Sequence, residues 1–359
     1  MAFLAAFGRF IPPVYEGFND IHVNDKRGIA IPARLTITQY LLLDYPGEAD
    51  FIETITKEFT SSFHPLVVSF NGKSFDSQIL KTRCLMNGIV IPEYFHADLL
   101  HPARRLWRRV LSNCSQATVE VSILGLDRDG DVSGAMAPEI WFSFLRSGEN
   151  HGNNSEQELL SVCDHNARDI VGLASLFLCL GEIAAEPFRS RKRFRFDEEA
   201  LALAWRSAVK KSSFFFADDK THQRYAETGE LLLQAAAENG WPRAVFTLGL
   251  DLFKNGRNQE GRALMLKITQ EISDVNSDES ELGADNFADG KFTDGKFADA
   301  FPRNIKAAAF KALAIDAEWR LGDYMLALAY TRSALNFTEI SGRLRKDLEK
   351  RQLRLLAKT

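Results

Sequence analysis

The stretch Val67-Val-Ser-Phe-Asn71-Gly-Lys-Ser-Phe-Asp76 decides the fold of the first half of this chain. A short apolar run over residues 66–70 is typical of a buried strand, and the run ends at Asn71-Gly, a pair that favours a turn. We expect Ser74 to act as the N-cap of a helix that follows. Asp76 then lies in the first helical turn, at the carboxyl edge of the sheet, where open α/β sheets collect their ligands.

The sequence upstream of this stretch supplies the other parts of an α/β domain. Residues 34–43 alternate apolar and polar side chains, which predicts a strand. Residues 47–60 carry Phe51, Ile55 and Phe59 at helical spacing. A strand, a helix and a strand in this order predict an α/β domain over residues 1–185, with a sheet that is covered by helices.

A second polar pair lies farther along, on a helix predicted over residues 161–177. His165 and Asp169 are four residues apart, so their side chains share one helical face. Two interpretations are open from the residues alone: a surface ion pair, or a site that also uses Asp76. Asp76 also has a simple explanation, because helix N-termini favour carboxylates by up to about 1 kcal/mol.

The second half of the chain has a helical pattern, which predicts an all-α domain over residues 201–359. A basic segment, residues 186–200, joins the halves and contains five cations between Arg189 and Arg195. This segment is either a solvated linker or a strip that contacts phosphates. Residues 273–302 are acidic and repeat a Phe-x-Asp motif every five residues, which predicts a flexible insert.

Two turns of the helical half are related by spacing. Gly256 and Gly322 each follow a helix end and are 66 residues apart, close to twice the roughly 34-residue tetratricopeptide period. Ala327 and Ala334 are small enough to let paired helices approach closely. This half resembles a degenerate tetratricopeptide array whose groove would bind a protein partner, and an unspecialised helical bundle is the alternative.

Composition excludes several classes of protein. No stretch approaches the roughly 20 apolar residues that a membrane span needs, so we expect no membrane segment. The four cysteines form no CxxC pair, which favours reduced thiols in a cytoplasmic protein over disulfides or a zinc site. The formal net charge of -4 gives no argument for nucleic-acid binding by itself.

The polar segments together resemble a known family. Asn71-x-x-x-Phe75-Asp76, followed far downstream by His165-x-x-x-Asp169, resembles the second and third exonuclease motifs of the DEDD superfamily, whose members have a ribonuclease-H-like fold. The most similar family is that of the YprB-type predicted exonucleases. Further matching stretches occur in the same order, and the similarity extends over about residues 1–180; these stretches are residues 96–108, 111–116, 131–134 and 138–148.

This resemblance implies a chemistry and a set of residues. Asp76 and Asp169 correspond to two of the four carboxylates that hold Mg²⁺ or Mn²⁺, and His165 falls where the superfamily places the residue that orients or deprotonates the attacking water. The resemblance implies 3′–5′ hydrolysis of a single-stranded DNA or RNA end. Residues that we expect to contact the nucleic acid are Asn71, Lys73, Ser74, Arg104, Arg105 and Arg108, although a solvated helix face explains the three arginines equally well.

The first motif of the superfamily is absent from the sequence. Residues 1–10 resemble the second strand of the family, so the opening strand with its Asp-x-Glu ligands would lie upstream of residue 1. Either the cellular protein is longer, or the domain is a decayed and inactive relative. The sequence therefore predicts a metal-dependent 3′–5′ exonuclease, and the alternative is a non-catalytic scaffold that binds nucleic acid or protein.

Overall fold

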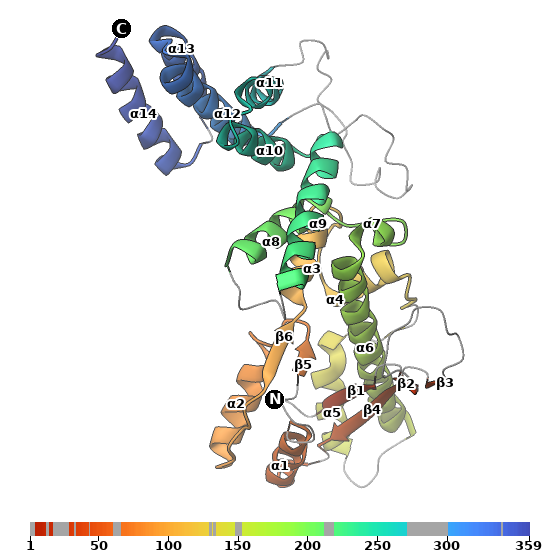
Figure 1. The fold of residues 1–359 in the computed structure, drawn as a ribbon. Helices are drawn as coiled ribbons and strands as arrows, with labels where there is room; N and C mark the ends of the chain where they lie inside the picture. Colours follow the sequence, from red (N-terminus) through yellow and green to blue (C-terminus); the bar gives the residue numbers. More distant parts are fainter. Residues whose placement is uncertain are drawn as a thin grey trace, which may run out of the picture. The chain divides into compact units, whose positions relative to one another are not determined.

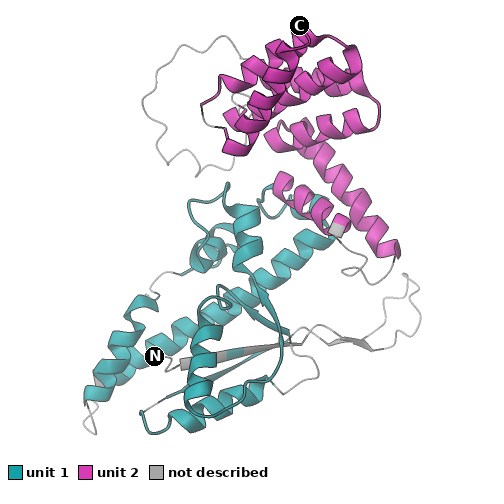
Figure 2. Ribbon diagram, turned by 90° about the vertical axis from the view of Figure 1, so that its left-hand side faces the viewer, with its two compact units in different colours: residues 1–197 teal, residues 198–359 magenta. Residues whose placement is uncertain are grey.

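The structure is a computed structural model, which divides into two compact units, residues 1–197 and residues 198–359 (Figure 2). The residues that it describes are 4–11, 14–16, 29–31, 34–42, 44–59, 66–128, 131, 134–147, 153–211, 219–270, 301–338 and 340–359. The predicted insert at residues 273–302 lies outside the described residues except for its last two positions. Each unit is described by itself.

The strands of the first unit form three two-stranded ladders. The two longer ladders are an antiparallel pair and a parallel pair (Figure 1). The antiparallel ladder joins β1, Leu4–Ile11, to β4, Arg34–Leu41, and a short second one joins β2, Val14–Glu16, to β3, Ile29–Ile31. The parallel ladder joins β5, Leu66–Ser69, to β6, Phe95–Asp98. The predicted strands at 34–43 and 66–70 are confirmed as β4 and β5.

Helices follow and cover these strands. Their bounds are α1 Glu48–Glu58, α2 Asp76–Met86, α3 Leu100–Trp107, α4 Gln116–Val119, α5 Ala137–Ser147, α6 Asn153–Ala185 and α7 Pro187–Ser190. A π-helical turn, Glu120–Leu124, continues α4, and a 3₁₀ turn, Gly134–Met136, precedes α5. The long helix α6 contacts β1, β4 and β5, so it packs against strands of both larger ladders (Figure 1).

The core of this unit lies between β4 and the helices α1, α2, α5 and α6. Trp141 is its largest member: it is fully buried, and its indole nitrogen donates a hydrogen bond of 2.9 Å to the Leu42 carbonyl. Phe51 and Ile55 are buried beside it, and Phe59 is buried at the end of α1, so the helical spacing seen in the sequence marks the face that packs inward.

The turn between β5 and α2 differs from the sequence prediction. Helix α2 begins at Asp76, and its N-cap residue is Phe75, without a side-chain capping bond. The predicted cap at Ser74 is therefore wrong. Asn71 adopts a left-handed backbone conformation, with φ of 66°, and its carbonyl accepts hydrogen bonds from the amides of Ser74 and Phe75. This extra turn moves the start of the helix beyond Ser74.

The segment predicted as a basic linker belongs largely to the first unit, which ends at Asp197. Trp107 donates a 2.8 Å hydrogen bond from its indole nitrogen to the Arg195 carbonyl. Phe196 and Asp197 are buried, and Arg109 binds the Asp197 carboxylate. These contacts fix the end of the segment on α3, while the cations at positions 189 and 191–193 stay exposed.

The second unit is built from helices that pack consecutively. Its helices are α8 Glu198–Lys211, α9 Asp219–Glu238, α10 Pro242–Lys254, α11 Asn258–Thr269, α12 Arg303–Asp316, α13 Tyr324–Leu335 and α14 Gly342–Leu356, with a π-helical turn at Ala317–Leu321. Each of these helices contacts the next one along the chain (Figure 1). The predicted all-α organisation is confirmed for the described residues, and the tetratricopeptide character of the helices stays a prediction.

Small residues and one buried carboxylate set the spacing of these helices. A β-carbon at Gly261 would lie 3.1 Å from the Gly249 carbonyl oxygen, so α10 and α11 approach at two glycines. Ala327 and Ala334 are fully buried. Glu199 is also fully buried, and one of its carboxylate oxygens accepts hydrogen bonds from the first amides of α10, those of residues 243 and 244, at 2.7 and 2.9 Å.

Candidate functional site

The loop after β5 is organised by one buried carboxylate that the sequence analysis did not single out. Asp98, the last residue of β6, accepts hydrogen bonds from the backbone amides of Asn71 at 2.8 Å and Lys73 at 3.0 Å. A third bond comes from the amide of Leu100 at 3.1 Å. Desolvation raises the pKa of Asp98, but the three N–H donors outweigh it and hold the pKa below its usual value. The parallel pairing of β5 and β6 brings these groups together.

Asp76 lies beside this loop and is exposed. Partial desolvation and the nearby charge of Asp98 raise its pKa above the usual value, against the opposing effect of its own backbone amide. His96 is close enough to both carboxylates to interact with their charges, and its ring nitrogens lie 2.7 Å from Ser69 Oγ and 3.4 Å from Ser77 Oγ. We call these residues, Asn71, Lys73, Asp76, His96 and Asp98, the loop cluster.

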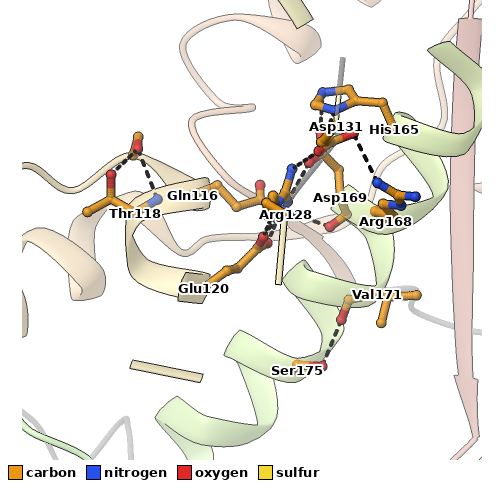
Figure 3. A network of polar contacts seen from close by, with 11 residues as sticks. Gln116, Thr118, Glu120, Arg128, Asp131, His165, Arg168, Asp169, Val171 and Ser175 are labelled. Carbon is orange, nitrogen blue, oxygen red and sulfur yellow. Dashed lines mark hydrogen bonds and ion pairs between the residues drawn. The ribbon is translucent and has the colours of Figure 1, made fainter. Parts of the chain in front are cut away.

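A second group of polar residues lies around His165 and Asp169 of α6 and includes side chains from other segments. We call it the α6 cluster, and its members are Glu120, Arg128, Asp131, His165 and Asp169 (Figure 3). Nε2 of His165 lies 3.4 Å from Asp169 Oδ2, so the predicted pair on one helical face is real. Nδ1 of the same ring is buried and lies 2.9 Å from Asp131 Oδ2, at ion-pair distance but without the alignment of a hydrogen bond. The imidazole is therefore held between two carboxylates.

Arg128 is the central cation of the α6 cluster. Its guanidinium lies 2.7 Å from Asp169 Oδ1 and 3.1 Å from Asp131 Oδ2, and it also binds Glu120 (Figure 3). Arg168 lies farther out, 3.6 Å from Asp131 Oδ1. Desolvation raises the pKa of Asp131, but the neighbouring His165 ring and the Arg128 guanidinium outweigh it and hold the pKa of that carboxyl below the usual value. Arg128 thus contacts three carboxylates with a single positive charge.

Glu120 is the buried member of the α6 cluster, with 1% of its surface exposed. Desolvation raises the pKa of its carboxyl, although hydrogen bonds from Gln116 and Arg128 oppose the shift. Gly172 of α6 makes room for this side chain, because a β-carbon at that position would overlap the Glu120 carboxylate. Gln116 also donates a 2.7 Å bond to the Asp169 carbonyl, which ties the start of α4 to α6.

An open concavity of about 490 Å³ lies beside the α6 cluster. Its lining includes two arginines, Arg128 and Arg168, and three acidic residues, Glu120, Asp127 and Asp164.

The three arginines predicted to contact nucleic acid are on and just beyond α3. Arg104, Arg105 and Arg108 are all exposed. Arg104 and Arg108 are one helical turn apart, and both lie near enough to Cys114 to lower the pKa of its thiol, although desolvation is the larger influence and raises that pKa. Lys73 and Ser74 are also exposed, while the amides of Asn71 and Lys73 are already used by Asp98.

The structure brings His165 and Asp169 together, whereas Asp76 has other neighbours. Among the described residues, no hydrogen bond or ion pair joins the loop cluster to the α6 cluster, and no three His, Cys, Asp or Glu side chains are arranged to hold a metal ion. The oxygen donors are of the kind that Mg²⁺ and Mn²⁺ prefer. However, Asp169 is bound by Arg128, so the described residues do not by themselves form a metal centre.

Three residues of these clusters, Arg128, Asp131 and Asp98, lie in segments without a local motif that marks them as a site. Arg128 and Asp131 lie in Asp127-Arg-Asp-Gly-Asp131, whose spacing fails as a calcium loop. Asp98 lies in a stretch that supported only the family resemblance. Asp98 could have been predicted from its position at the carboxyl end of β6, because the carboxyl ends of the parallel strands β5 and β6 lie at the same edge of the sheet.

Comparison with known proteins agrees with this architecture. Residues 29–180 match the family model of the RNase_H superfamily. The described part of the first unit, with its small sheet, its flanking helices and its polar clusters, is thus an RNase H-like domain. No solved structure gave a significant match.

A curated relative shares a larger part of the sequence. The chain is 29% identical over 241 residues to YprB of Bacillus subtilis (strain 168), an uncharacterized protein. The match covers 66% of this chain and 53% of YprB, so the chain spans about half the length of that relative. The expected resemblance to a YprB-type, RNase H-like protein is confirmed.

A helix that crosses a membrane needs about 20 consecutive, predominantly apolar residues. Of the helices in the described ranges, including the 33-residue α6, none has both the length and the apolar character that crossing a membrane requires.

Proposed function

We propose that this chain is a nucleic-acid hydrolase that removes nucleotides from the 3′ end of single-stranded DNA or RNA with the help of Mg²⁺ or Mn²⁺. The observation that carries the proposal is the His165–Asp169 pair on one face of α6, within a region that matches the RNase_H superfamily. In the proposal Asp169 and Asp76 are metal ligands. A bound divalent ion would supply the activation of water and the charge for the leaving oxygen.

The proposed role of His165 is to orient or deprotonate the attacking water through Nε2, which lies beside the Asp169 carboxylate. Asp131 supports this role because its carboxylate lies against Nδ1 and fixes the ring. The adjacent concavity supports the nucleic-acid assignment, because Arg128 and Arg168 line it. In the proposal the exposed cations Lys73, Arg104, Arg105 and Arg108, with Asn71 and Ser74, guide the strand toward the site.

The test is digestion of 5′-labelled single-stranded DNA and RNA in the presence of Mn²⁺. We expect a ladder that shortens from the 3′ end, and we expect Asp169→Asn and Asp76→Asn to abolish it. The matched control is Glu158→Gln, which removes an exposed carboxylate from the same helix α6 and should leave the rate unchanged. Digestion that survives both aspartate variants would remove the assignment of these carboxylates.

A second function is favoured by Arg128. Its guanidinium lies 2.7 Å from the carboxylate that the first proposal gives to a metal ion, and it contacts Asp131 and Glu120 as well. In this alternative the domain is a scaffold that binds nucleic acid or a protein partner without hydrolysing it. A carboxylate that already pairs with an arginine, as Asp169 does, has less electrostatic attraction for a second cation.

Calorimetric titration with Mn²⁺ separates the two functions independently of activity. Saturable binding that is lost in Asp169→Asn supports the hydrolase. Absence of Mn²⁺ binding, combined with oligonucleotide binding that is unchanged by a chelator, supports the scaffold.

A further inference from the structure

The last helix of the second unit carries a row of exposed cations. Lys346, Lys350 and Arg354 are spaced by four residues, and Arg343 precedes them by three, so these four side chains share one face of α14. All four are exposed. From Arg343 to Arg354 the row extends about 16 Å at 1.5 Å per residue. We call it the cationic row.

Two acidic residues near this row, Asp347 and Glu318, are already paired with cations, and one more, Glu349, is exposed on α14. Asp347 lies on the same side of α14, and its carboxylate is bound by Lys311 of α12 at 2.6 Å. Glu318 is fully buried and binds three cations, Arg351, Arg354 and Lys358. Among the described residues, no carboxylate lies within ion-pair distance of Arg343, Lys346 or Lys350. The face therefore keeps a net positive charge.

The row borders a concavity, and an exposed aromatic ring lies at its far end. The concavity measures about 910 Å³, and its charged lining consists of four cations, Lys311, Arg343, Lys346 and Lys350, and one carboxylate, Asp347. At the other end, Trp319 is 66% exposed, and the cations of Arg354 and Lys358 lie 5.9 and 5.4 Å from its ring centroid. Cations that follow a backbone, with an aromatic ring for the bases, are the elements by which proteins bind single-stranded nucleic acid.

We propose that the cationic row and Trp319 form a second nucleic-acid-binding surface, which holds the phosphates and stacks on a base of a single strand. Lys346, Lys350 and Arg343 would contact consecutive phosphates, and Trp319 would take a base on its exposed face. The surface shares its ligand with the function proposed above. It does not depend on hydrolysis, on a metal ion or on the α6 cluster.

Fluorescence anisotropy with a labelled single-stranded 30-mer tests this surface. The full chain carries Asp169→Asn, and a chelator is present, so neither digestion nor metal contributes. We expect the triple variant Arg343→Gln, Lys346→Gln, Lys350→Gln to bind about 10- to 100-fold more weakly near 0.1 M salt, because three phosphate contacts are lost. The slope of log affinity against log salt should become less negative by about 2.

The matched control removes three exposed cations elsewhere in the same unit: Lys220, Lys254 and Lys267, each changed to Gln. It makes the same change in net charge and should lower the affinity much less. Trp319→Leu should weaken binding about tenfold, and Trp319→Phe should retain most of the affinity, because a phenyl ring still stacks. This pair of variants distinguishes stacking from a general loss of apolar surface.

Several results would overturn the proposal. The first is equal affinity of the triple variant and its control, and the second is equal affinity of the two Trp319 variants. Displacement of the oligonucleotide by polyglutamate at equal charge concentration would assign the face to acidic proteins instead. Tighter binding to phosphatidylserine vesicles than to the oligonucleotide would assign it to a membrane surface. Failure of digestion with intact binding would count only against the hydrolase.

Discussion

Replacing Asp98 by Asn should destabilise the RNase H-like domain more than any change to the exposed Asp76. In the wild type, Oδ1 accepts the amides of Asn71 and Leu100, and Oδ2 accepts the amide of Lys73. An asparagine whose oxygen replaces Oδ1 keeps the first two bonds without the charge. Its NH₂ group then faces the Lys73 amide, so that donor loses its partner.

The magnitude follows from these three bonds. An unsatisfied buried donor costs about 1–3 kcal/mol, and a hydrogen bond to a charged group contributes roughly 1 kcal/mol more than a neutral one. We therefore expect Asp98→Asn to lower the free energy of unfolding by about 2–4 kcal/mol at pH 7. Asp76→Asn, at an exposed position, should change it by less than about 0.5 kcal/mol.

The effect should depend on pH with a definite sign. The pKa of Asp98 is lower in the folded protein than its usual value, so its stabilisation is fully present above the unfolded pKa of about 3.9. It is lost as the pH falls through the folded pKa. The difference between wild type and Asp98→Asn should therefore persist from pH 7 to about 5 and shrink below about 4.

Urea unfolding combined with hydrogen exchange measures this change. Exchange should accelerate in peptides that contain the amides of residues 71, 73 and 100, and the peptides of the second unit serve as an internal reference. Unchanged exchange at these amides, or an equal loss of stability in Asp76→Asn, would refute the assignment of Asp98 as the residue that holds the loop.

Four other substitutions test the two buried carboxylates and the space that Gly172 leaves for one of them. Gly172→Ala should destabilise the first unit by about 1–3 kcal/mol, because the added methyl group would overlap Glu120. Gly181→Ala lies in the same helix with open space around it, so this control should stabilise the unit by about 0.5–1 kcal/mol. The melting temperatures of the two variants measure the difference. Arg128→Gln should cost about 3–5 kcal/mol near pH 7, since Glu120 stays buried without its cation, and the loss seen in chemical unfolding should diminish toward pH 4 as that carboxyl takes a proton. Glu318→Gln should destabilise the second unit by about 3–5 kcal/mol by leaving three cations without their buried partner, and a loss below about 1 kcal/mol in urea unfolding would contradict this role.

The elements with strong periodicity could be predicted from the sequence. The alternation in β4 and the spacing of Phe51, Ile55 and Phe59 depend on neighbours along the chain, so local patterns identify them. The turn at Asn71 was predicted, but the helix start was misplaced. A cap at Ser74 would bind an amide of the first helical turn, but the Ser77 amide donates to the Gly72 carbonyl instead, while the left-handed Asn71 and the Asp98 carboxylate organise the loop before the helix.

The candidate site was predictable only where its partners share one helix. His165 and Asp169 are one turn apart, so their proximity follows from helical geometry. Arg128 and Asp131 reach them from a separate segment, and Asp98 reaches the loop across a parallel ladder. Such contacts depend on how distant segments pack, and no local spacing in one sequence specifies them.

The carboxylate of Glu199 has a practical consequence for dissecting this protein. It anchors the first two amides of α10 from a position only two residues inside the second unit. An expression fragment that starts at residue 201, where periodicity alone suggests cutting, would discard this anchor and leave both donors to solvent. A fragment that starts at residue 198 keeps Glu199. The three residues 198–200 therefore decide whether the first turn of α10 keeps its side-chain acceptor.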